Sequence, residues 1–119
     1  MKPCSFTKKE RLLKKQDFIE AVSKGRRFRT KNFTIFIKQN DRGIKRLGLS
    51  VSRKVGTAVK RNRIKRLIRE FFRQNKEMFP ASSDISISVR YGYSPAGLSE
   101  PARELAEFLT RLKSITNGG

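Results

Sequence analysis

The side chains of this chain that could do chemistry are cations, not catalytic nucleophiles or metal ligands. Between Arg53 and Arg73 there are nine Lys and Arg residues and a single acid, Glu70. The chain has no histidine and one cysteine, Cys4, which excludes a zinc site and a Ser–His or Cys–His catalytic pair. Acids are too sparse for carboxylate-based metal chemistry. We therefore expect no catalytic residue, and no metal or other cofactor bound by the protein's own side chains.

The net charge points to a polyanionic partner. With Lys+Arg 29 and Asp+Glu 10, the chain carries a formal charge of +19, and self-repulsion of that size destabilises the compact state. A nucleic acid offsets it, because each cation that meets a phosphate releases counterions. We expect no small-molecule substrate. An anionic membrane is the weaker alternative, since the apolar residues of the basic segment have core spacing and no run of ~18 apolar residues exists.

The amino terminus and the cysteine content bear on the compartment. Residues 1–6 contain no apolar segment of the kind that a signal peptide needs. One cysteine forbids an internal disulfide and is typical of a reducing compartment. We expect a cytoplasmic protein without a membrane partner.

The basic segment is predicted to form the central helix, from about residue 58 to Lys76. Its apolar residues follow the i, i+3, i+4, i+7 spacing of a core-facing stripe: Ile64, Leu67, Ile68 and Phe71. At about 100° per residue, the opposite side carries Asn62, Lys65, Arg66, Arg69 and Arg73. This side has almost no acids for i,i+4 pairing, so it needs an external polyanion.

The remaining elements follow from hydrophobic periodicity and turn residues. A short helix is expected from Asp17 to about Ser23, and a final helix from the N-cap Ser99 to about Ile115. Alternation predicts strands at 33–38, 47–52 and 84–90, with a possible edge strand at 26–31. The turn at 40–43 predicts that the strands at 33–38 and 47–52 are antiparallel neighbours.

The expected fold is α/β (α+β). We predict one domain spanning residues 1–119, with flexible ends at 1–14 and 116–119. It is a sandwich of a mixed sheet of about four strands with three helices, in the order α-β-β-β-α-β-α.

The two faces of the predicted sheet differ. One is apolar and forms the core: Phe33, Ile35, Ile37, Leu47, Leu49, Val51, Ile85, Ile87 and Val89. The other is small, hydroxylated and basic: Thr34, Phe36, Lys38, Arg46, Gly48, Ser50, Ser52, Ser86, Ser88 and Arg90. This second face is either an ordinary solvated surface or a groove for single-stranded nucleic acid with Phe36 as a stacking platform. Phe18 either borders it or is buried under the first helix.

The block from Gly48 to Glu70 closely resembles the signature of the bacterial ribonuclease P protein component. The hallmark of that family is the Arg-Asn-Arg run, here Arg61-Asn62-Arg63. The upstream Arg11-Leu12, Asp17-Phe18 and Gly25 fit the same pattern, as does the downstream strand that begins with Asp84-Ile85. The resemblance therefore spans nearly the whole chain.

The resemblance implies a fold and a role. The fold has a left-handed crossover through the basic helix and is shared with a small-subunit ribosomal protein domain and domain IV of elongation factor G. The implied partners are ribonuclease P RNA and precursor tRNA, and the holoenzyme is the endoribonuclease that makes the mature 5′ end of tRNA. Mg²⁺ held by the RNA subunit would activate the water. A cleft between the sheet and the first helix would take the 5′ leader.

The resemblance also assigns residues. Those expected to bind the catalytic RNA are Arg53, Lys54, Arg61, Asn62, Arg63, Lys65, Arg66 and Arg69. Those expected in the leader-binding cleft are Phe18, Val22, Phe36, Ser50, Ser88 and Arg90. Phe18 and Phe36 fall on the aromatic positions, whereas Val22 stands where some relatives carry a third aromatic. Arg63 has an alternative role, in which it pairs with Glu70 or caps a strand end.

Composition alone leaves other functions open. The main alternative is a structural RNA-binding protein of ribosomal type without enzymatic association. An autonomous nuclease is a second alternative. A DNA-binding helix-turn-helix protein is a distant third, because the predicted strands have no place in it.

Overall fold

The computed structural model describes residues 8–12, 14–95, 97 and 99–118, with side chains described up to Lys113. Its helices are α1 (Lys15–Lys24), α2 (Ala58–Gln74) and α3 (Ser99–Gly118). Its strands are β1 (Arg26–Arg29), β2 (Phe33–Gln39), β3 (Arg46–Ser50) and β4 (Ser83–Val89). Short 3-10 turns lie at η1 (Lys8–Glu10), η2 (Arg53–Val55) and η3 (Lys76–Met78). The predicted fold class and element order are confirmed, while the expectations for residues 1–7 and for Cys4 lie outside the described residues.

The sheet has the order β1-β2-β4-β3. β2 runs antiparallel to β1 and β4, and β3 runs parallel to β4. The prediction that the strands at 33–38 and 47–52 are neighbours is therefore wrong, because β4 lies between them. β4 is buried along nearly its whole length, and burial on both faces favours a central position.

The loop after β2 is held in a shape that admits β4. The backbone N–H of Asn40 donates to the carbonyl of Ser82 at 2.7 Å, so the chain stays paired with the β4 side beyond the end of β2. The side-chain amide of Asn40 donates to Asp84 at 2.8 Å and to the carbonyl of Ile44 at 3.2 Å. These bonds make the 40–45 segment a wide connection instead of a hairpin turn.

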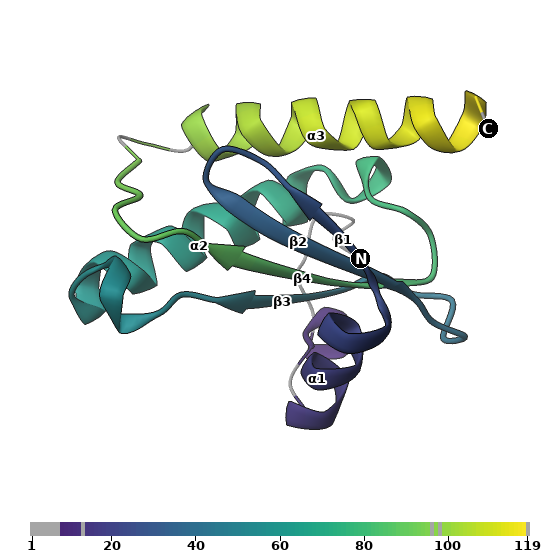
Figure 1. The fold of residues 1–119 in the computed structure, drawn as a ribbon, viewed down its shortest axis with the longest axis horizontal. Helices are drawn as coiled ribbons and strands as arrows, with labels where there is room; N and C mark the ends of the chain where they lie inside the picture. The colour runs from purple at the N-terminus through teal and green to yellow at the C-terminus, as the bar shows by residue number, and fades with distance from the viewer. Residues whose placement is uncertain (1–7, 13, 96, 98, 119) are drawn as a thin grey trace.

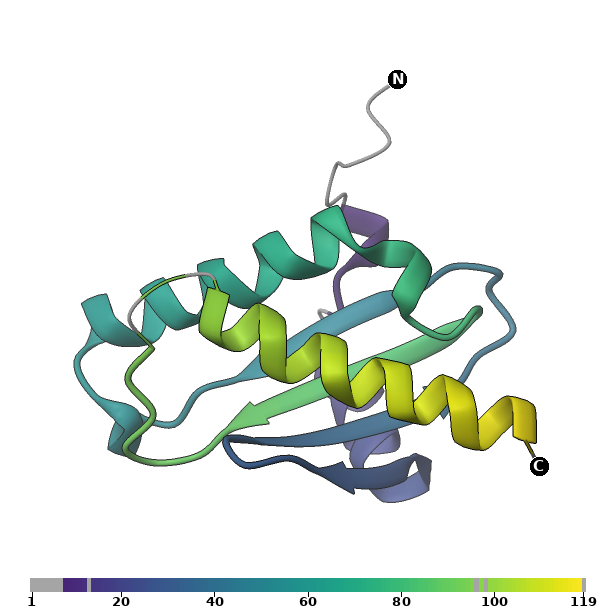
Figure 2. The same cartoon turned by 90° about the horizontal axis from the view of Figure 1, so that it is seen from above.

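The parallel strands β3 and β4 are joined through α2. Figure 2, which views the sheet from the side of the helices, shows both strands running the same way, with β4 between β3 and β2. Seen with α2 in front and the strands pointing up, β4 lies to the left of β3, so the crossover is left-handed, as the family resemblance implied. Most parallel crossovers have the opposite hand.

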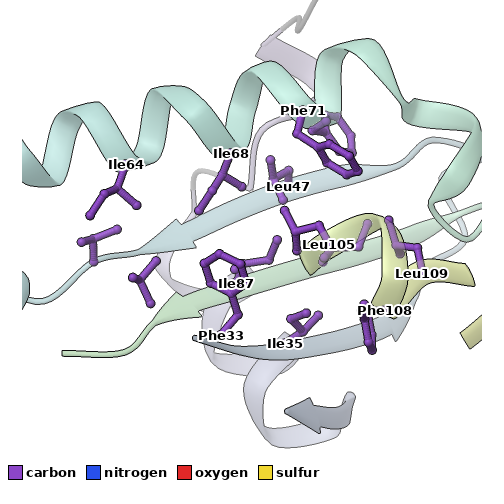
Figure 3. Packing of buried hydrophobic residues seen from close by; sticks show 14 of the residues in the cluster. Phe33, Ile35, Leu47, Ile64, Ile68, Phe71, Ile87, Leu105, Phe108 and Leu109 are labelled. Carbon is purple, nitrogen blue, oxygen red and sulfur yellow. The ribbon is translucent and has the colours of Figure 1, made fainter. Parts of the chain in front are cut away.

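α2 and α3 cover the apolar face of the sheet, and α1 lies across the other face (Figure 1). The core between the sheet and the two long helices includes Phe33, Ile35, Leu47, Ile64, Ile68, Phe71, Ile87, Leu105 and Leu109 (Figure 3). The predicted stripe of α2 is buried except for the half-buried Leu67. Phe72 is also fully buried, although it falls outside that stripe.

The ends of the helices have local causes. Thr57 caps α2, because its hydroxyl accepts a hydrogen bond from the N–H of Lys60 at 3.2 Å. α2 ends at Gln74, earlier than predicted, and the chain continues into η3. α3 continues to Gly118, three residues beyond the predicted end. The carboxylate of Glu104 on α3 accepts from the N–H and the side-chain amide of Asn32, which ties α3 to the β1–β2 turn.

Candidate nucleic-acid interface

The solvent-facing side of α2 forms a basic depression with a volume of about 430 Å³. We call it the α2 front; its lining residues are Arg11, Asn62, Arg66, Arg69, Glu70 and Arg73. The α2 residues recur at intervals of three or four, which places them on one side of the helix. Arg11 comes from the segment before α1, which is held against β3 by the N–H of Leu12 donating to the carbonyl of Leu47 at 3.0 Å. Four guanidinium groups and one carboxylate thus share this surface.

The charges of the α2 front affect one another. Partial burial and the nearby positive charge of Arg11 lower the pKa of Arg69. The hydrogen bond from Arg73 lowers the pKa of Glu70 against the opposing effect of desolvation, and the positive charge of Arg73 and a hydrogen bond from Gln74 add to the lowering. Glu70 therefore stays ionised and offsets the charge of its neighbour Arg73. The crowding of Arg11 against Arg69 is the arrangement that a bound phosphate would relieve.

The other predicted RNA-binding residues of α2 lie on its flanks. The Nε of Arg61 donates to the carbonyl of Gly56 at 3.2 Å. Arg63 donates to the carbonyl of Pro95 at 2.8 Å, so it faces the loop before α3, while the Glu70 carboxylate accepts from Arg73 and Gln74. Lys65 is half-buried, on the same flank of α2 as Arg61. Asn62, Arg66 and Arg69 are the predicted α2 residues that the structure brings together.

The two predicted residues before α2, Arg53 and Lys54, are exposed on η2. The hydroxyl of Ser52 caps this turn by accepting from the N–H of Lys54 at 3.2 Å. Ser52 is therefore a capping residue, not the last residue of β3 as predicted. η2 directly precedes α2, so both cations lie at the amino-terminal end of this helix.

On the opposite face of the sheet, the register aligns Arg27, Phe36, Ser86 and Gly48 in one row across the strands. α1 lies over this row: a Cβ added to Gly48 would lie 2.5 Å from two ring carbons of Phe18. Phe18 and Phe36 are both half-buried and share this face, separated by the buried Ser86. Phe18 thus packs on the sheet beneath α1 and keeps part of its surface exposed.

The next row along the strands consists of Arg29, Thr34, Ser88 and Ser50. Ser50 is exposed and Ser88 half-buried. We call the surface made by Phe18, Val22, Phe36, Ser50, Ser88 and Arg90 the open sheet face. Val22 is 46% exposed on α1, and Arg90 is exposed with its guanidinium donating to the carbonyl of Lys31 at 3.1 Å. The structure therefore places all six predicted residues on one side of the sheet.

Arg46, which the alternation placed on this basic face of the sheet, is not one of its exposed cations. It is 8% exposed, and it donates to both carboxylate oxygens of Asp84 at 2.8 Å and to Asp17 at 3.2 Å. These hydrogen bonds, first of all the one to Asp84, raise the pKa of Arg46 against the opposing effect of burial. Burial alone would raise the pKa of Asp84, but the bonds from Arg46 and Asn40 outweigh it and the pKa lies below its usual value. Arg46 joins α1 to β4 through its hydrogen bonds to Asp17 and Asp84, so its guanidinium is not free to bind phosphate.

Sequence reasoning missed two residues at these surfaces. Arg11 joins the α2 front through tertiary packing; it fits the family pattern, but periodicity and spacing gave it no role at this surface. Tyr91 is 63% exposed, and the Nζ of Lys54 lies 5.4 Å from its ring centroid. The sequence did contain a signal for Tyr91, because an aromatic residue beside a cation, directly after the predicted strand at 84–90, is a candidate for binding a nucleotide base.

Neither a metal site nor a membrane span is found in the described part of the chain. Among residues 8–12, 14–95, 97 and 99–118, no three or more His, Cys, Asp or Glu side chains gather closely enough to hold a metal ion. Within the same residues, no helix has the length and apolar character needed to cross a membrane.

Comparison with known proteins identifies the family. The family model described as "Ribonuclease P" matches residues 6–113. The ribonuclease P protein component of Syntrophus aciditrophicus is 46% identical over 111 residues, covering 93% of each chain. The ribonuclease P protein of Thermotoga maritima has a similar structure, with a TM-score of 0.78 and 32% identity over 86% of this chain and 96% of that one. The ribonuclease P protein of Staphylococcus aureus has a TM-score of 0.77 and 31% sequence identity, over 87% of this chain and 94% of that one. Together with the fold, the left-handed crossover and the basic α2, these matches show that the chain belongs to the family of bacterial ribonuclease P protein components.

Proposed function

We propose that this protein, as a subunit of ribonuclease P, docks on the ribonuclease P RNA through the α2 front and η2 and binds the 5′ leader of precursor tRNA across the open sheet face. The observation that carries the proposal is the separation of two surfaces of different chemistry on one small fold. The α2 front is crowded with guanidinium groups, whereas the open sheet face combines two partly exposed phenyl rings with small hydroxylated residues.

The α2 front suits a folded RNA. Guanidinium groups bind phosphate oxygens in a bidentate manner, and the crowding of Arg11 and Arg69 favours a bound anion at this point. Such contacts are independent of base sequence and position the protein on the RNA. Family membership favours this role over that of a structural RNA-binding protein of ribosomal type.

The open sheet face suits single-stranded RNA. Unpaired bases stack on aromatic rings whatever their identity, and small side chains such as Ser50 and Ser88 let the strand approach the sheet. Leader binding adds affinity for the precursor and not for the mature tRNA, which has lost its leader. The protein thereby favours substrate binding and product release without supplying a reacting group.

The hydrolytic chemistry belongs, in this proposal, to the RNA subunit and to Mg²⁺ that the RNA holds. The described residues offer no acidic cluster for a metal, and the chain has no histidine for acid–base catalysis. We infer a cytoplasmic protein, in keeping with a role in tRNA processing.

The test is Mg²⁺-dependent cleavage of a precursor tRNA by the purified protein with and without its cognate RNA subunit. We expect 5′ cleavage only in the presence of the RNA. At low Mg²⁺ the holoenzyme should be faster than the RNA alone, because the protein's cations neutralise phosphates near the RNA core. Cleavage by the protein alone that is lost on chelating Mg²⁺ would refute the division of labour proposed here.

A further inference from the structure

The carboxyl ends of β3 and β4 meet at one edge of the sheet, because the two strands are parallel and adjacent. Ser50 and Ser88 are paired there, so the residues that follow each strand leave the sheet side by side. After β3 the chain enters η2 with Arg53 and Lys54; after β4 come Arg90 and Tyr91. Figure 1 shows both strands ending on the side of the molecule where α2 begins. Three cations and one aromatic residue thus follow the two strand ends, and the guanidinium of Arg90 reaches from there to the carbonyl of Lys31.

Tyr91 is held at this edge by a tight turn. The N–H of Tyr93 donates back to the carbonyl of Arg90 at 3.4 Å, and Gly92 between them has a φ of 83°, which a glycine adopts without strain. The ring of Tyr91 is 63% exposed while the Tyr93 ring packs in the core against Phe33, with 5.2 Å between centroids. The turn therefore sends one tyrosine inward as an anchor and leaves the other in solvent.

The exposed ring carries a cation. The Nζ of Lys54 lies 5.4 Å from the Tyr91 centroid, within the range of a cation–π contact. The contact joins η2 to the turn after β4. The exposed Tyr91 ring has Lys54 on its face and follows Arg90 in the chain, whose exposed guanidinium donates to the carbonyl of Lys31. This is the composition of a binding site for one unpaired nucleotide, in which the base stacks on the ring and a cation meets the phosphate.

We propose that Tyr91, with Lys54 and Arg90, binds one unpaired nucleotide of the 5′ leader and so extends the open sheet face toward α2; Lys54 then serves the leader, and Arg53 is the η2 cation left for the RNA subunit. This inference rests on the proposed function and adds a base-stacking site to it. β4 ends at Val89, three residues after Ser86, so at about 3.3 Å per residue the end of the strand lies roughly 10 Å from the row of Phe36 and Ser86, and Tyr91 lies in the turn beyond that end. The Ser88–Ser50 pair lies between Phe36 and Tyr91, so the leader RNA can pass over small, hydroxylated residues from one ring to the other.

The experiment compares three variants in holoenzyme reconstituted with the RNA subunit: Tyr91→Ala, Tyr91→Phe and Phe36→Ala. Dissociation constants are measured for precursor tRNA and for mature tRNA. We expect Tyr91→Ala to weaken precursor binding by about 5- to 150-fold, the range for one stacked base, and to leave mature tRNA binding unchanged. Tyr91→Phe keeps the ring and should stay within about twofold of the parent protein.

A fluorescent base analogue locates the nucleotide. When 2-aminopurine is placed at successive leader positions, its fluorescence should be quenched at one position by Tyr91 and at a different position by Phe36. Tyr91→Ala should restore the fluorescence at the first position, and Phe36→Ala should restore it at the second. Two separate positions would establish two stacking sites. One shared position would overturn the inference, because Tyr91 would then add no site of its own.

The remaining outcomes separate this inference from the proposed function. If Phe36→Ala weakens precursor binding and Tyr91→Ala does not, the Tyr91 site is refuted and the open sheet face stands. If Tyr91→Ala weakens precursor and mature tRNA equally, the nucleotide does not come from the leader, and the assignment is wrong. If neither variant discriminates precursor from mature tRNA, the leader-binding role of the whole face fails with it.

Discussion

The ring of Phe18 lies directly over Gly48, in the space that a side chain on β3 would occupy. A Cβ at residue 48 would lie 2.5 Å from the Cε1 and Cζ of Phe18 and 2.9 Å from the Cβ of Leu12. α1 and the segment before it are therefore seated on β3 because residue 48 has no side chain. This contact sets the height of α1 above the sheet, and with it the shape of the open sheet face.

Gly48→Ala should destabilise the protein by about 1–3 kcal/mol, because the added methyl group overpacks against a ring and another side chain. Chemical denaturation gives the free energy of unfolding. Gly97→Ala is the matched control, since nothing lies within 4 Å of a Cβ at Gly97. Equal stability of Gly48→Ala and Gly97→Ala would mean that α1 is not seated in the way described.

Arg46→Leu should cost about 3–5 kcal/mol, because it leaves the carboxylate of Asp84 buried without its bidentate partner. Lys24→Ala removes the cation of an exposed pair, in which Lys24 lies 3.7 Å from Glu20, and should change the free energy of unfolding by less than about 1 kcal/mol. Urea titrations of both variants measure the difference. A cost for Arg46→Leu no larger than that for Lys24→Ala would contradict the anchoring role of Arg46.

Stability should fall on acidification partly through Asp84. Its folded pKa is below the unfolded value of about 3.9, so the unfolded state binds the proton first and the stabilisation is present above that pH. The contribution is lost as the pH falls through the folded pKa. Urea titrations across the acid range should show a shallower pH dependence for Asp84→Asn than for the parent protein. An identical dependence would show that Asp84 does not titrate differently in the two states.

Phe36→Ala should weaken binding of precursor tRNA by about 1–3 kcal/mol while leaving mature tRNA unaffected, because a stacked leader base is present only in the precursor. Equilibrium binding to the reconstituted holoenzyme measures both. Thr34→Ala, on the same strand and face, is the matched control for a change that removes no ring. Equal loss for precursor and mature tRNA would refute the assignment of this face to the leader.

The double variant Arg66→Ala with Arg69→Ala should weaken assembly with the RNA subunit and flatten its salt dependence. Each lost phosphate contact should reduce the slope of log K against log salt by roughly 0.7–0.9. Arg111→Ala, an exposed arginine on α3 outside the α2 front, controls for the loss of charge alone. An unchanged slope in the double variant would count against phosphate binding at the α2 front.

Sequence periodicity determined the elements, their faces and the basic side of α2. The spacing of Ile64, Ile68 and Phe71 decides which side of the helix is buried, since a helix turns about 100° per residue whatever packs on it. Strict alternation likewise assigned Ile85 and Ile87 to the core and Ser86 and Ser88 to the opposite face. The family block from Gly48 to Glu70 was equally readable, because its residues are contiguous in the chain.

Only the tertiary structure decided which segments meet. Alternation specifies the face of a strand and not its neighbour, so the position of β4 between β2 and β3 was out of reach of local patterns. The same holds for Arg46, which a surface pattern marks as a free cation and which the fold buries between Asp17 and Asp84. Three other pairs also join segments that are far apart in the sequence: Phe18 with Gly48, Arg11 with Arg69, and Lys54 with Tyr91. Such contacts depend on the packing of whole elements, and local periodicity carries no information about that packing.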